Sequence, residues 1–264
     1  MSLAPHRARK RFSQNFLHDP RFIERIVEAI DPCPGDRIVE IGPGQGAITA
    51  SLIERAGAID ALEIDRDLSF ALRARFAPDQ LRLHEGDALR FNWQEFAATR
   101  APLRIAGNLP YHISTPMLFA LLPIAAEVAD QHFMLQKEVV DRIIAAPGSK
   151  TYGRLSVALQ FRYRVRKLFD VPPGAFAPSP QVTSSFVRLV SKPVKELPNV
   201  DADILGLIVT AAFSQRRKTL RNALSGVLRE PQIIAAGVDP KARAETLHPE
   251  AFVGLARALA ANPR

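Results

Sequence analysis

An asparagine, a proline and a tyrosine lie together in Asn108-Leu109-Pro110-Tyr111, just after residues 103–106, which we predict to be a strand with an apolar end. An asparagine side chain offers one carbonyl oxygen as an acceptor and two N–H groups as donors. The proline fixes its own φ and favours an extended conformation at the preceding leucine. The tyrosine adds a flat aromatic face with a polar end. This combination can hold a planar heterocycle that carries an amino group, although Asn and Pro are also common in an ordinary turn from a strand into a helix.

A glycine-rich turn follows residues 37–41, which we predict to be a short, mainly apolar strand. The turn begins at Gly42, reads Gly-Pro-Gly-Gln-Gly, and leads into the helical pattern of residues 47–56. A strand, a glycine-rich turn and a helix in this order open a nucleotide-binding βαβ unit. The spacing differs from G-x-G-x-x-G, the dinucleotide fingerprint that places a pyrophosphate at the helix start. It therefore favours a nucleoside cofactor without phosphates over NAD, with a ligand-free glycine turn as the alternative.

Two carboxylates follow the next two predicted strands. Glu63 comes 21 residues after Gly42, a distance at which an acidic residue can accept hydrogen bonds from ribose hydroxyls. Asp87 follows the strand predicted at residues 81–84 and can accept a hydrogen bond from an adenine amino group. Ligands bind at the carboxyl ends of the strands in an open parallel sheet. We therefore expect the glycine loop, Glu63, Asp87 and Asn108 to meet at one edge of such a sheet.

The elements that would position these residues suggest two domains. The chain has 264 residues, of which 47% are hydrophobic, enough for a large buried core and a smaller second one. We predict an α/β, Rossmann-like domain over residues 1–190, which includes a basic N-terminal arm. A linker rich in proline and charge follows over residues 191–200, and residues 201–264 are predicted to form a small all-helical domain.

The charge of the chain indicates a polyanionic partner. Its formal net charge is +8, which favours nucleic acid over a membrane surface. Basic residues occur in the N-terminal arm, in the polar loop over residues 147–154 and in the predicted helical domain. The candidates for phosphate contacts are Arg9, Lys10, Arg11, Lys150, Arg154, Arg216, Arg217, Lys218 and Arg221. For the arm, a solvated terminus is the alternative.

The composition also excludes several classes of protein. The single cysteine, Cys33, rules out an intrachain disulfide and a cysteine-based zinc cluster, and we expect no metal site. A reducing, cytoplasmic setting fits this cysteine usage. No apolar run approaches the length of a membrane span, and the basic start lacks the apolar core of a secretory signal. We expect a monomer without a membrane partner.

Eight segments, taken in order, resemble the ribosomal RNA adenine dimethyltransferases, most closely the bacterial small-subunit enzymes. The segments are Ser13-Gln-Asn-Phe-Leu17, Glu40-Ile-Gly-Pro-Gly-Gln-Gly46, Glu63-Ile-Asp65, Glu85-Gly-Asp87, Asn108-Leu-Pro-Tyr111, Pro147-Gly-Ser-Lys-Thr-Tyr-Gly-Arg154, Phe176-Ala-Pro-Ser-Pro-Gln-Val182 and Phe213-Ser-Gln-Arg-Arg-Lys218. The resemblance covers almost the whole chain. Ser13 stands where the family usually has Gly and Gln45 where Leu is frequent, and neither replaces a side chain that would do chemistry.

The resemblance implies S-adenosylmethionine as the cofactor and a methyltransferase sheet of the Rossmann-like type. It implies that Asn15 and Leu17 close over the cofactor and that Gly42 lines its backbone floor. Glu63 would hold the ribose, in agreement with the spacing, and Asp87 would read the cofactor adenine. Asn108 would lie where the methionine end of the cofactor meets the substrate.

The implied reaction is methyl transfer to the N6 atoms of two adjacent adenosines near the 3′ end of small-subunit rRNA, with a role in small-subunit biogenesis. The Asn108 oxygen and the backbone carbonyl of Leu109 or Pro110 would accept the hydrogen bonds of the amino group. Tyr111 would stack on the adenine, although its ring could instead pack inward. Phe12 and Phe176 are candidates for further pocket walls. The RNA partner is expected within a partly assembled subunit.

Four other functions stay open at the level of sequence. A large-subunit rRNA adenine methyltransferase is the nearest, although its members more often carry Ile at position 109. A DNA adenine methyltransferase lacks support because no separate base-reading domain is evident. A ribosome-assembly factor with secondary catalysis would use the same surface. An NAD-dependent oxidoreductase is the remaining alternative.

Overall fold

The computed structural model describes residues 14–100, 102–215 and 217–261. The predictions for Arg9, Lys10, Arg11, Phe12 and Arg216 lie outside these residues. Within the described part of the chain, no helix is both long enough and apolar enough to cross a bilayer.

Two compact units make up the chain. The first comprises Met1–Val140 and Val165–Ser191, and the second comprises Asp141–Arg164 and Lys192–Arg264. The second unit is larger than the helical domain predicted at residues 201–264, because Tyr152 and Val157 are buried in its core. The predicted linker at residues 191–200 stays a prediction. The second unit also includes the earlier segment Asp141–Arg164, which the sequence did not assign to the helical domain.

The first unit is built on a seven-stranded sheet of order β4-β3-β2-β5-β6-β9-β7. The bounds are β2 (Arg37–Ile41), β3 (Ile59–Glu63), β4 (Leu81–Glu85), β5 (Leu103–Asn108), β6 (Val128–Gln136), β7 (Tyr163–Val171) and β9 (Ser184–Ser191). Strands β4, β3, β2, β5 and β6 run parallel, and β9 is antiparallel to β6. This arrangement confirms the predicted α/β, Rossmann-like fold.

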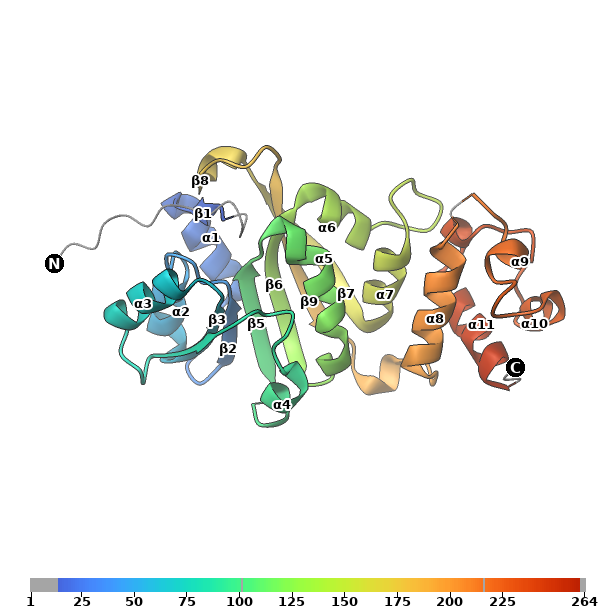
Figure 1. Cartoon of the computed structure of the whole chain (residues 1–264), viewed down its shortest axis with the longest axis horizontal. Coiled ribbons are helices and arrows are strands. Elements are labelled where there is room, and N and C mark those ends of the chain that lie inside the picture. Colours follow the sequence, from blue (N-terminus) through green and yellow to red (C-terminus); the bar gives the residue numbers. More distant parts are fainter. Residues whose placement is uncertain (1–13, 101, 216, 262–264) are drawn as a thin grey trace. The chain divides into compact units, whose positions relative to one another are not determined.

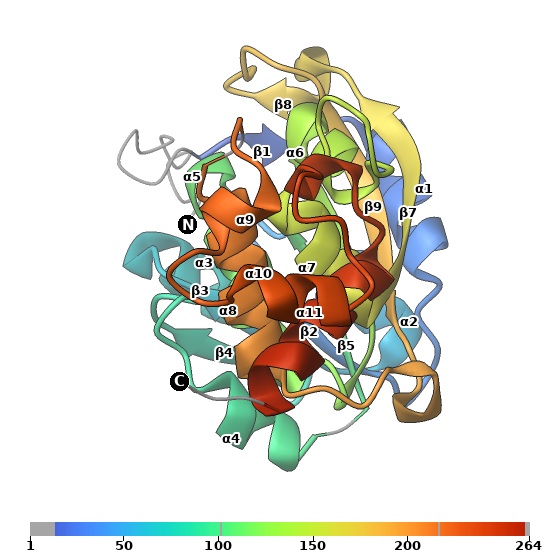
Figure 2. The ribbon, with the colours of Figure 1, turned by 90° about the vertical axis from the view of Figure 1, so that its right-hand side faces the viewer.

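Helices cover both faces of this sheet. Figure 2 shows α1 (Pro20–Ile30) and α2 (Thr49–Ala56) on one side, with α4 (Trp93–Ala98) and α5 (Tyr111–Ala120) on the other. Helix α3 (Arg66–Arg75) contacts β3 and β4. The apolar residues of α1 and α2 share one buried cluster with the sheet, which fixes the first face. A separate pair of short strands, β1 (Phe16–Leu17) and β8 (Phe176–Ala177), is antiparallel.

The second unit is mainly helical. Its helices are α7 (Arg154–Arg162), α8 (Ala202–Phe213), α9 (Leu220–Ala223), α10 (Glu230–Ala235) and α11 (Pro249–Ala261), and α6 (Lys137–Ile143) ends in it. Figure 1 labels these elements in green to red. The 3-10 helices among the described residues of both units are η2 (Leu122–Ile124), η3 (Pro173–Ala175), η4 (Val194–Glu196) and η5 (Ala244–Thr246). The hydroxyl of Tyr152 donates a hydrogen bond to the carbonyl of Leu247 (2.9 Å), which ties the loop before α7 to the region before α11.

Gly107 allows strands β2 and β5 to approach closely just before Asn108. A Cβ atom at this position would lie 2.5 Å from the carbonyl oxygen of Ile41. The backbone of β2 cannot move away without disturbing the sheet. We therefore expect Gly107→Ala to lower the free energy of unfolding by about 1–3 kcal/mol in urea denaturation. Gly206→Ala is the control, because a Cβ there meets no atom within 4 Å and alanine favours helix α8. Equal stability of the Gly107→Ala variant and the wild type would contradict the prediction.

A buried network of charges joins the central strands of the sheet. Asp130 on β6 accepts hydrogen bonds from Arg104 on β5 (2.9 Å) and from Arg188 on β9 (2.9 Å). Arg104 also donates to Asp36 (2.6 Å) and to the carbonyl of Asp31 (3.0 Å), at the end of α1. Burial alone would raise the pKa of Asp130, but these cationic partners outweigh it and hold that pKa below its usual value. The negative charge of Asp130 is therefore balanced by the two arginines.

His132 should make the fold sensitive to mild acid. Its buried ring stacks on Phe186, and burial lowers its pKa from 6.5 to about 4. The unfolded chain takes up this proton as the pH falls through 6.5, whereas the folded chain does not until about pH 4. The stability of the wild type relative to a His132→Met variant should therefore fall by about 2 to 3 kcal/mol between roughly pH 7.5 and pH 4.5. Urea denaturation at the two pH values measures this change, and a constant difference would contradict it.

Candidate active site

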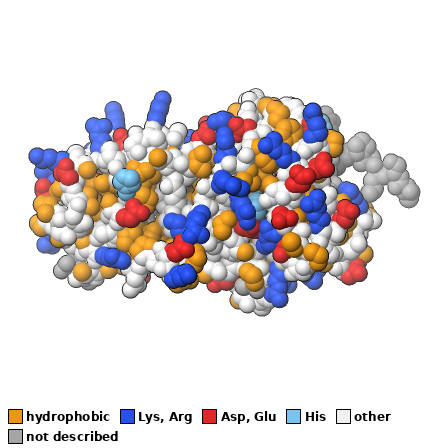
Figure 3. All heavy atoms as spheres, turned by 180° about the vertical axis from the view of Figure 1, so that it is seen from behind, with side chains coloured by type: hydrophobic (Ala, Val, Ile, Leu, Met, Phe, Trp, Pro, Cys, Tyr) orange, Lys and Arg blue, Asp and Glu red, His pale blue; other side chains and the backbone are white. Residues whose placement is uncertain are grey.

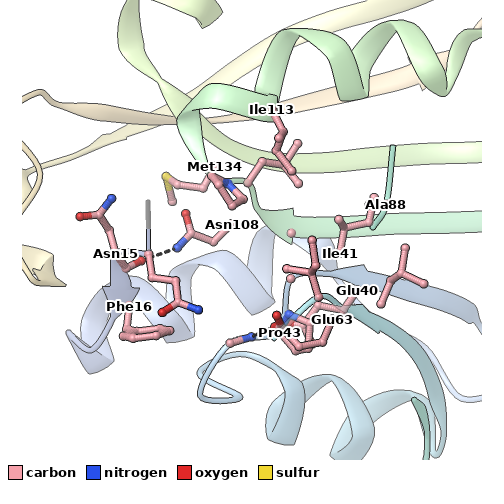
Figure 4. A pocket seen from close by; sticks show the side chains of 18 of the residues that line it. Asn15, Phe16, Glu40, Ile41, Pro43, Glu63, Ala88, Asn108, Ile113 and Met134 are labelled. Carbon is pink, nitrogen blue, oxygen red and sulfur yellow. Dashed lines mark hydrogen bonds between the residues drawn. The ribbon is translucent and has the colours of Figure 1, made fainter. Parts of the chain in front are cut away.

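A cavity of about 190 Å³ lies in the first unit, at the carboxyl ends of β2, β3 and β5. It collects the residues that the sequence singled out for cofactor binding and catalysis. These residues are Asn15, Leu17, Gly42, Glu63, Asp87, Asn108, Leu109, Pro110 and Tyr111. Figure 4 shows Asn15, Glu63 and Asn108 around this space. The residues predicted at the ends of successive strands therefore do lie together at one edge of the sheet.

The glycine loop after β2 forms part of the cavity wall. Gly42 and Gly44 have φ values of +68° and +60°, which favour glycine over residues with a side chain. A Cβ at Gly42 would meet no atom within 4 Å, so the backbone there faces open space. A Cβ at Gly44 would approach the ring of Phe16 to 3.2 Å. The loop can therefore bring its backbone close to a ligand while Phe16 closes over it.

Glu63 is held rigidly at the end of β3. One carboxylate oxygen accepts a hydrogen bond from the N–H of Gly44 (3.1 Å), and the other accepts from the N–H of Asp65 (2.9 Å). The side chain is buried, and burial raises the pKa of the carboxyl despite these two donors. Each oxygen retains a lone pair, so the carboxylate can accept hydrogen bonds from a pair of hydroxyl groups.

The charged groups around the cavity are acidic. Glu40, Glu63 and Asp87 line it, whereas its described lining includes no lysine or arginine. Burial raises the pKa of Glu40 to about 7, partly offset by a hydrogen bond from the hydroxyl of Thr49 (2.7 Å). A bound cation would favour the ionised form of each carboxyl group. The cavity therefore suits a positively charged ligand and is unfavourable for a pyrophosphate.

Asp87 lies in the loop after β4, where its carboxylate is partly exposed. One oxygen accepts a hydrogen bond from the backbone N–H of Leu89 (2.9 Å), which fixes the direction of the side chain. Ala88 and Leu89 lie beside it in the cavity wall and add apolar surface. A carboxylate above apolar side chains can accept a hydrogen bond from the amino group of a planar base.

The amide of Asn108 has a defined orientation. Its nitrogen donates a hydrogen bond to the backbone carbonyl of Asn15 (3.0 Å), drawn as a dashed line in Figure 4. A carbonyl can only accept, so the amide nitrogen must face Asn15 and the amide oxygen must point the other way. Asn15 therefore acts through its backbone as well as lining the cavity, and the oxygen of Asn108 stays available as an acceptor.

The two backbone carbonyls that follow Asn108 are not equivalent. The carbonyl of Pro110 accepts hydrogen bonds from the N–H of Ile113 (3.1 Å) and the hydroxyl of Ser114 (3.2 Å), as helix α5 begins. Both of its lone pairs are therefore engaged. Of the two carbonyls that the sequence left open as acceptors, Leu109 is the better candidate.

Tyr111 begins helix α5 with its ring half-buried. Its hydroxyl forms a hydrogen bond with the hydroxyl of Ser184 (2.8 Å), at the start of β9. Burial raises the pKa of this phenol, so the hydroxyl stays protonated at neutral pH. The polar end of the ring therefore points into the protein, while the residue still lines the cavity.

The cavity also contains residues that the sequence did not indicate. Asn108 on β5 pairs with Met134 on β6, which pairs with Phe186 on β9, and this row lines the cavity. Phe16 is a further aromatic wall. Phe176 is buried in the core and is not among the residues that line this cavity, and its role as a further pocket wall stays a prediction. Pairing across strands is the signal that would have found Met134 and Phe186.

The described candidates for RNA contact lie in the second unit. They are Lys150, Arg154, Arg217, Lys218 and Arg221. Arg221 lies 3.6 Å from the carboxylate of Glu230, which reduces its local positive charge. Figure 3 shows Lys and Arg side chains mixed with Asp, Glu and apolar side chains on the face that it draws. On that face the positive charge is distributed over the surface.

Comparison with known proteins places the chain in a family. Residues 5–261 match the family model described as ribosomal RNA adenine dimethylase. The chain belongs to this family. The resemblance carried by the eight sequence segments is thereby confirmed, and the enzyme class of the family is that of rRNA adenine dimethyltransferases.

Curated relatives and solved structures agree with this assignment. The chain is 54% identical over 263 residues to the ribosomal RNA small subunit methyltransferase A of Aromatoleum aromaticum, covering 99% of this chain and 98% of the relative. It is 52% identical over 253 residues to the protein of the same name from Acinetobacter baylyi, covering 95% and 92%. A dimethyladenosine transferase from Plasmodium falciparum has the same fold, with a TM-score of 0.78, 23% identity and coverage of 93% and 98%. The 23S rRNA methyltransferase ErmE also shares the fold, with a TM-score of 0.68, 24% identity and coverage of 93% and 100%.

Proposed function

We propose that this member of the family transfers methyl groups from S-adenosylmethionine to the N6 atoms of two adjacent adenosines near the 3′ end of small-subunit rRNA. The observation that carries the proposal is the cavity at the ends of β2, β3 and β5. In it, the oriented side-chain oxygen of Asn108 lies beside a wall formed by the glycine loop and by acidic side chains. The names of the relatives at 54% and 52% identity support the small subunit as the source of the RNA.

The residues present fit S-adenosylmethionine better than NAD. Three carboxyl groups and no lysine or arginine occur among the described residues that line the cavity, which suits a cation. Glu63 would hold the ribose hydroxyls, Asp87 would accept from the adenine amino group, and Asn15, Leu17 and Gly42 would enclose the ligand. When bound, S-adenosylmethionine supplies an electrophilic methyl group on a sulfonium sulfur.

Asn108 and Leu109 would orient the target amino group. The lone pair of an adenine N6 is delocalised into the ring, so the nitrogen is a weak nucleophile. The oxygen of Asn108 and the carbonyl of Leu109 would accept its two N–H bonds, which favours a pyramidal nitrogen and stabilises the positive charge that develops on it. Fixed positioning of the nitrogen is the larger contribution. The nitrogen becomes acidic once it is alkylated, so no tuned general base is needed.

The same arrangement permits a second transfer. After one methylation the amine retains a single N–H, so only one of the two acceptors is used. The target adenine must leave its stack in the RNA, at a cost of a few kcal/mol that is offset by contacts with an aromatic ring. Tyr111 is the aromatic residue on the wall that carries Asn108, and it would provide this contact.

The RNA would be held through its phosphates. Arg9, Lys10, Arg11 and the basic residues of the second unit would supply cations, which position a nucleic acid without reading its sequence. Selection of one site would then depend on the folded shape of the RNA within a partly assembled small subunit. We expect the protein to act as a monomer and to take part in small-subunit biogenesis.

Methyl transfer from labelled S-adenosylmethionine tests this function. The substrates are unmethylated small subunits, naked small-subunit rRNA and large subunits, with the modified nucleosides identified by mass spectrometry. The expected result is N6-dimethyladenosine at two adjacent positions near the 3′ end of the small-subunit rRNA. Label at another atom, or only in large subunits, would overturn the proposal. Calorimetry with S-adenosylmethionine and with NAD provides a second check, because binding of NAD alone would exclude this function.

A further inference from the structure

The hydroxyl of Ser184 is the hydrogen-bond partner of Tyr111, which lines the cavity. The two hydroxyl oxygens are 2.8 Å apart, and Ser184 is fully buried. Tyr111 is the first residue of helix α5, and Ser184 is the first residue of strand β9. The two residues are separated by 73 positions in the chain, so the bond joins elements that the local sequence does not connect.

Ser184 is a rigid anchor. It pairs with Gln136 in the antiparallel ladder between β6 and β9, and the preceding carbonyl of Thr183 accepts a hydrogen bond from the N–H of Lys137 (3.0 Å). The backbone around it is thus fixed to the end of β6. A hydrogen bond to such a residue restricts a tyrosine ring more strongly than a bond to a mobile loop would.

Ser185 provides an internal comparison. Successive side chains of a strand point to opposite faces of the sheet, so Ser184 and Ser185 face different surroundings. Both are fully buried, and the hydroxyl of Ser185 donates to the carboxylate of Asp170 (2.5 Å). Two adjacent buried serines therefore have the same chemistry, but only one contacts the site.

We propose that Ser184 is a positioning residue for methyl transfer, which holds the ring of Tyr111 so that one face of it is presented to the target adenine. This inference rests on the proposed function for the direction of the effect on catalysis. A tyrosine ring can rotate about two side-chain bonds. With its backbone fixed at the start of α5 and its hydroxyl bonded to β9, the axis of the ring is fixed, and because a phenol O–H lies in the plane of its ring, the hydrogen bond also favours one orientation of that plane. A base that stacks on it is then held at a fixed height beside Asn108.

A double-mutant cycle of Ser184→Ala and Tyr111→Phe tests the coupling. Each variant removes one partner of the same hydrogen bond, and each should lower the single-turnover rate of methyl transfer by roughly fivefold to tenfold. The KM for S-adenosylmethionine should not change. The double variant should be no slower than the slower single variant. Ser185→Ala is the control, and it should retain the wild-type rate. A normal rate for Ser184→Ala, or losses that multiply in the double variant, would overturn the proposal.

A second measurement does not depend on activity. The chain has three tyrosines, so NMR with tyrosine carrying ¹³C at the ring ε carbons gives few signals, and Tyr111→Phe identifies the one from Tyr111. In Ser184→Ala that signal should move toward the value of a freely rotating ring, and in Ser185→Ala it should stay in place. An unchanged signal in Ser184→Ala would show that Ser184 does not fix the ring of Tyr111. If the wild type fails to methylate rRNA, the proposed function is lost, and the NMR result still decides whether Ser184 fixes the ring.

Discussion

Asn108→Ala should lower the rate of methyl transfer by about 10²–10³-fold, the loss that follows removal of one fixed polar group at a centre of developing charge. The affinity for S-adenosylhomocysteine should change by less than about tenfold, since the glycine loop and Glu63 remain. The reason lies in the direction of the amide. Its nitrogen is bonded to the carbonyl of Asn15, so its oxygen is the group that can accept from N6.

Asn92→Ala is a matched control for this experiment. Asn92 also places its amide oxygen as an acceptor, from the N–H of Glu95 (3.2 Å), but it caps helix α4 and does not line the cavity. This variant should be somewhat less stable and fully active. Single-turnover rates and calorimetry on both variants make the comparison. If Asn108→Ala retained a rate within a few-fold of the wild type, Asn108 would have no role in orienting the nucleophile.

Glu63→Gln should weaken the binding of S-adenosylhomocysteine by about 100-fold, in line with the loss of hydrogen bonds to a charged group. Both oxygens of the carboxylate accept from backbone N–H groups, at Gly44 and at Asp65. A glutamine must turn its own NH₂ group toward one of these donors. The substitution therefore removes an acceptor for the ribose and also disturbs the glycine loop.

Glu85→Gln is the control for the second prediction. Glu85 pairs in register with Glu63 on the neighbouring strand, but it is exposed, forms an ion pair with Arg73, and does not line the cavity. Calorimetry should show wild-type affinity for Glu85→Gln. Equal affinities for the Glu63→Gln and Glu85→Gln variants would show that the buried carboxylate does not hold the cofactor.

Much of the site could be predicted because its residues lie at the ends of successive parallel strands. Gly42, Glu63, Asp87 and Asn108 each follow an apolar segment, and parallel strands bring such positions to one edge. The fold class followed from the same pattern. The direction of the Asn108 amide could not be predicted, since it depends on a backbone carbonyl 93 positions away.

The residues that the sequence missed depend on long-range pairing. Met134 enters the cavity because β6 pairs with β5, and Phe186 enters it because β9 pairs with β6, and no local pattern specifies these neighbours. Phe176 is buried in the core on β8, a strand that pairs with β1 from much earlier in the chain, and no local pattern specifies that pairing. Tyr152 lies in a polar, glycine-punctuated segment that suggested a loop, yet its ring is buried among helices.

The pairing of β1 with β8 has a consequence for the order in which the site is completed during translation. Asn15 and Phe16 are synthesised long before Phe176–Ala177, the partner strand of β1. The wall that these two residues form cannot reach its final pairing until β8 has been synthesised. A nascent chain that already carries the glycine loop and Asn108 therefore still lacks a closed cavity, so the ability to retain the ligand arises only when the first unit is nearly complete.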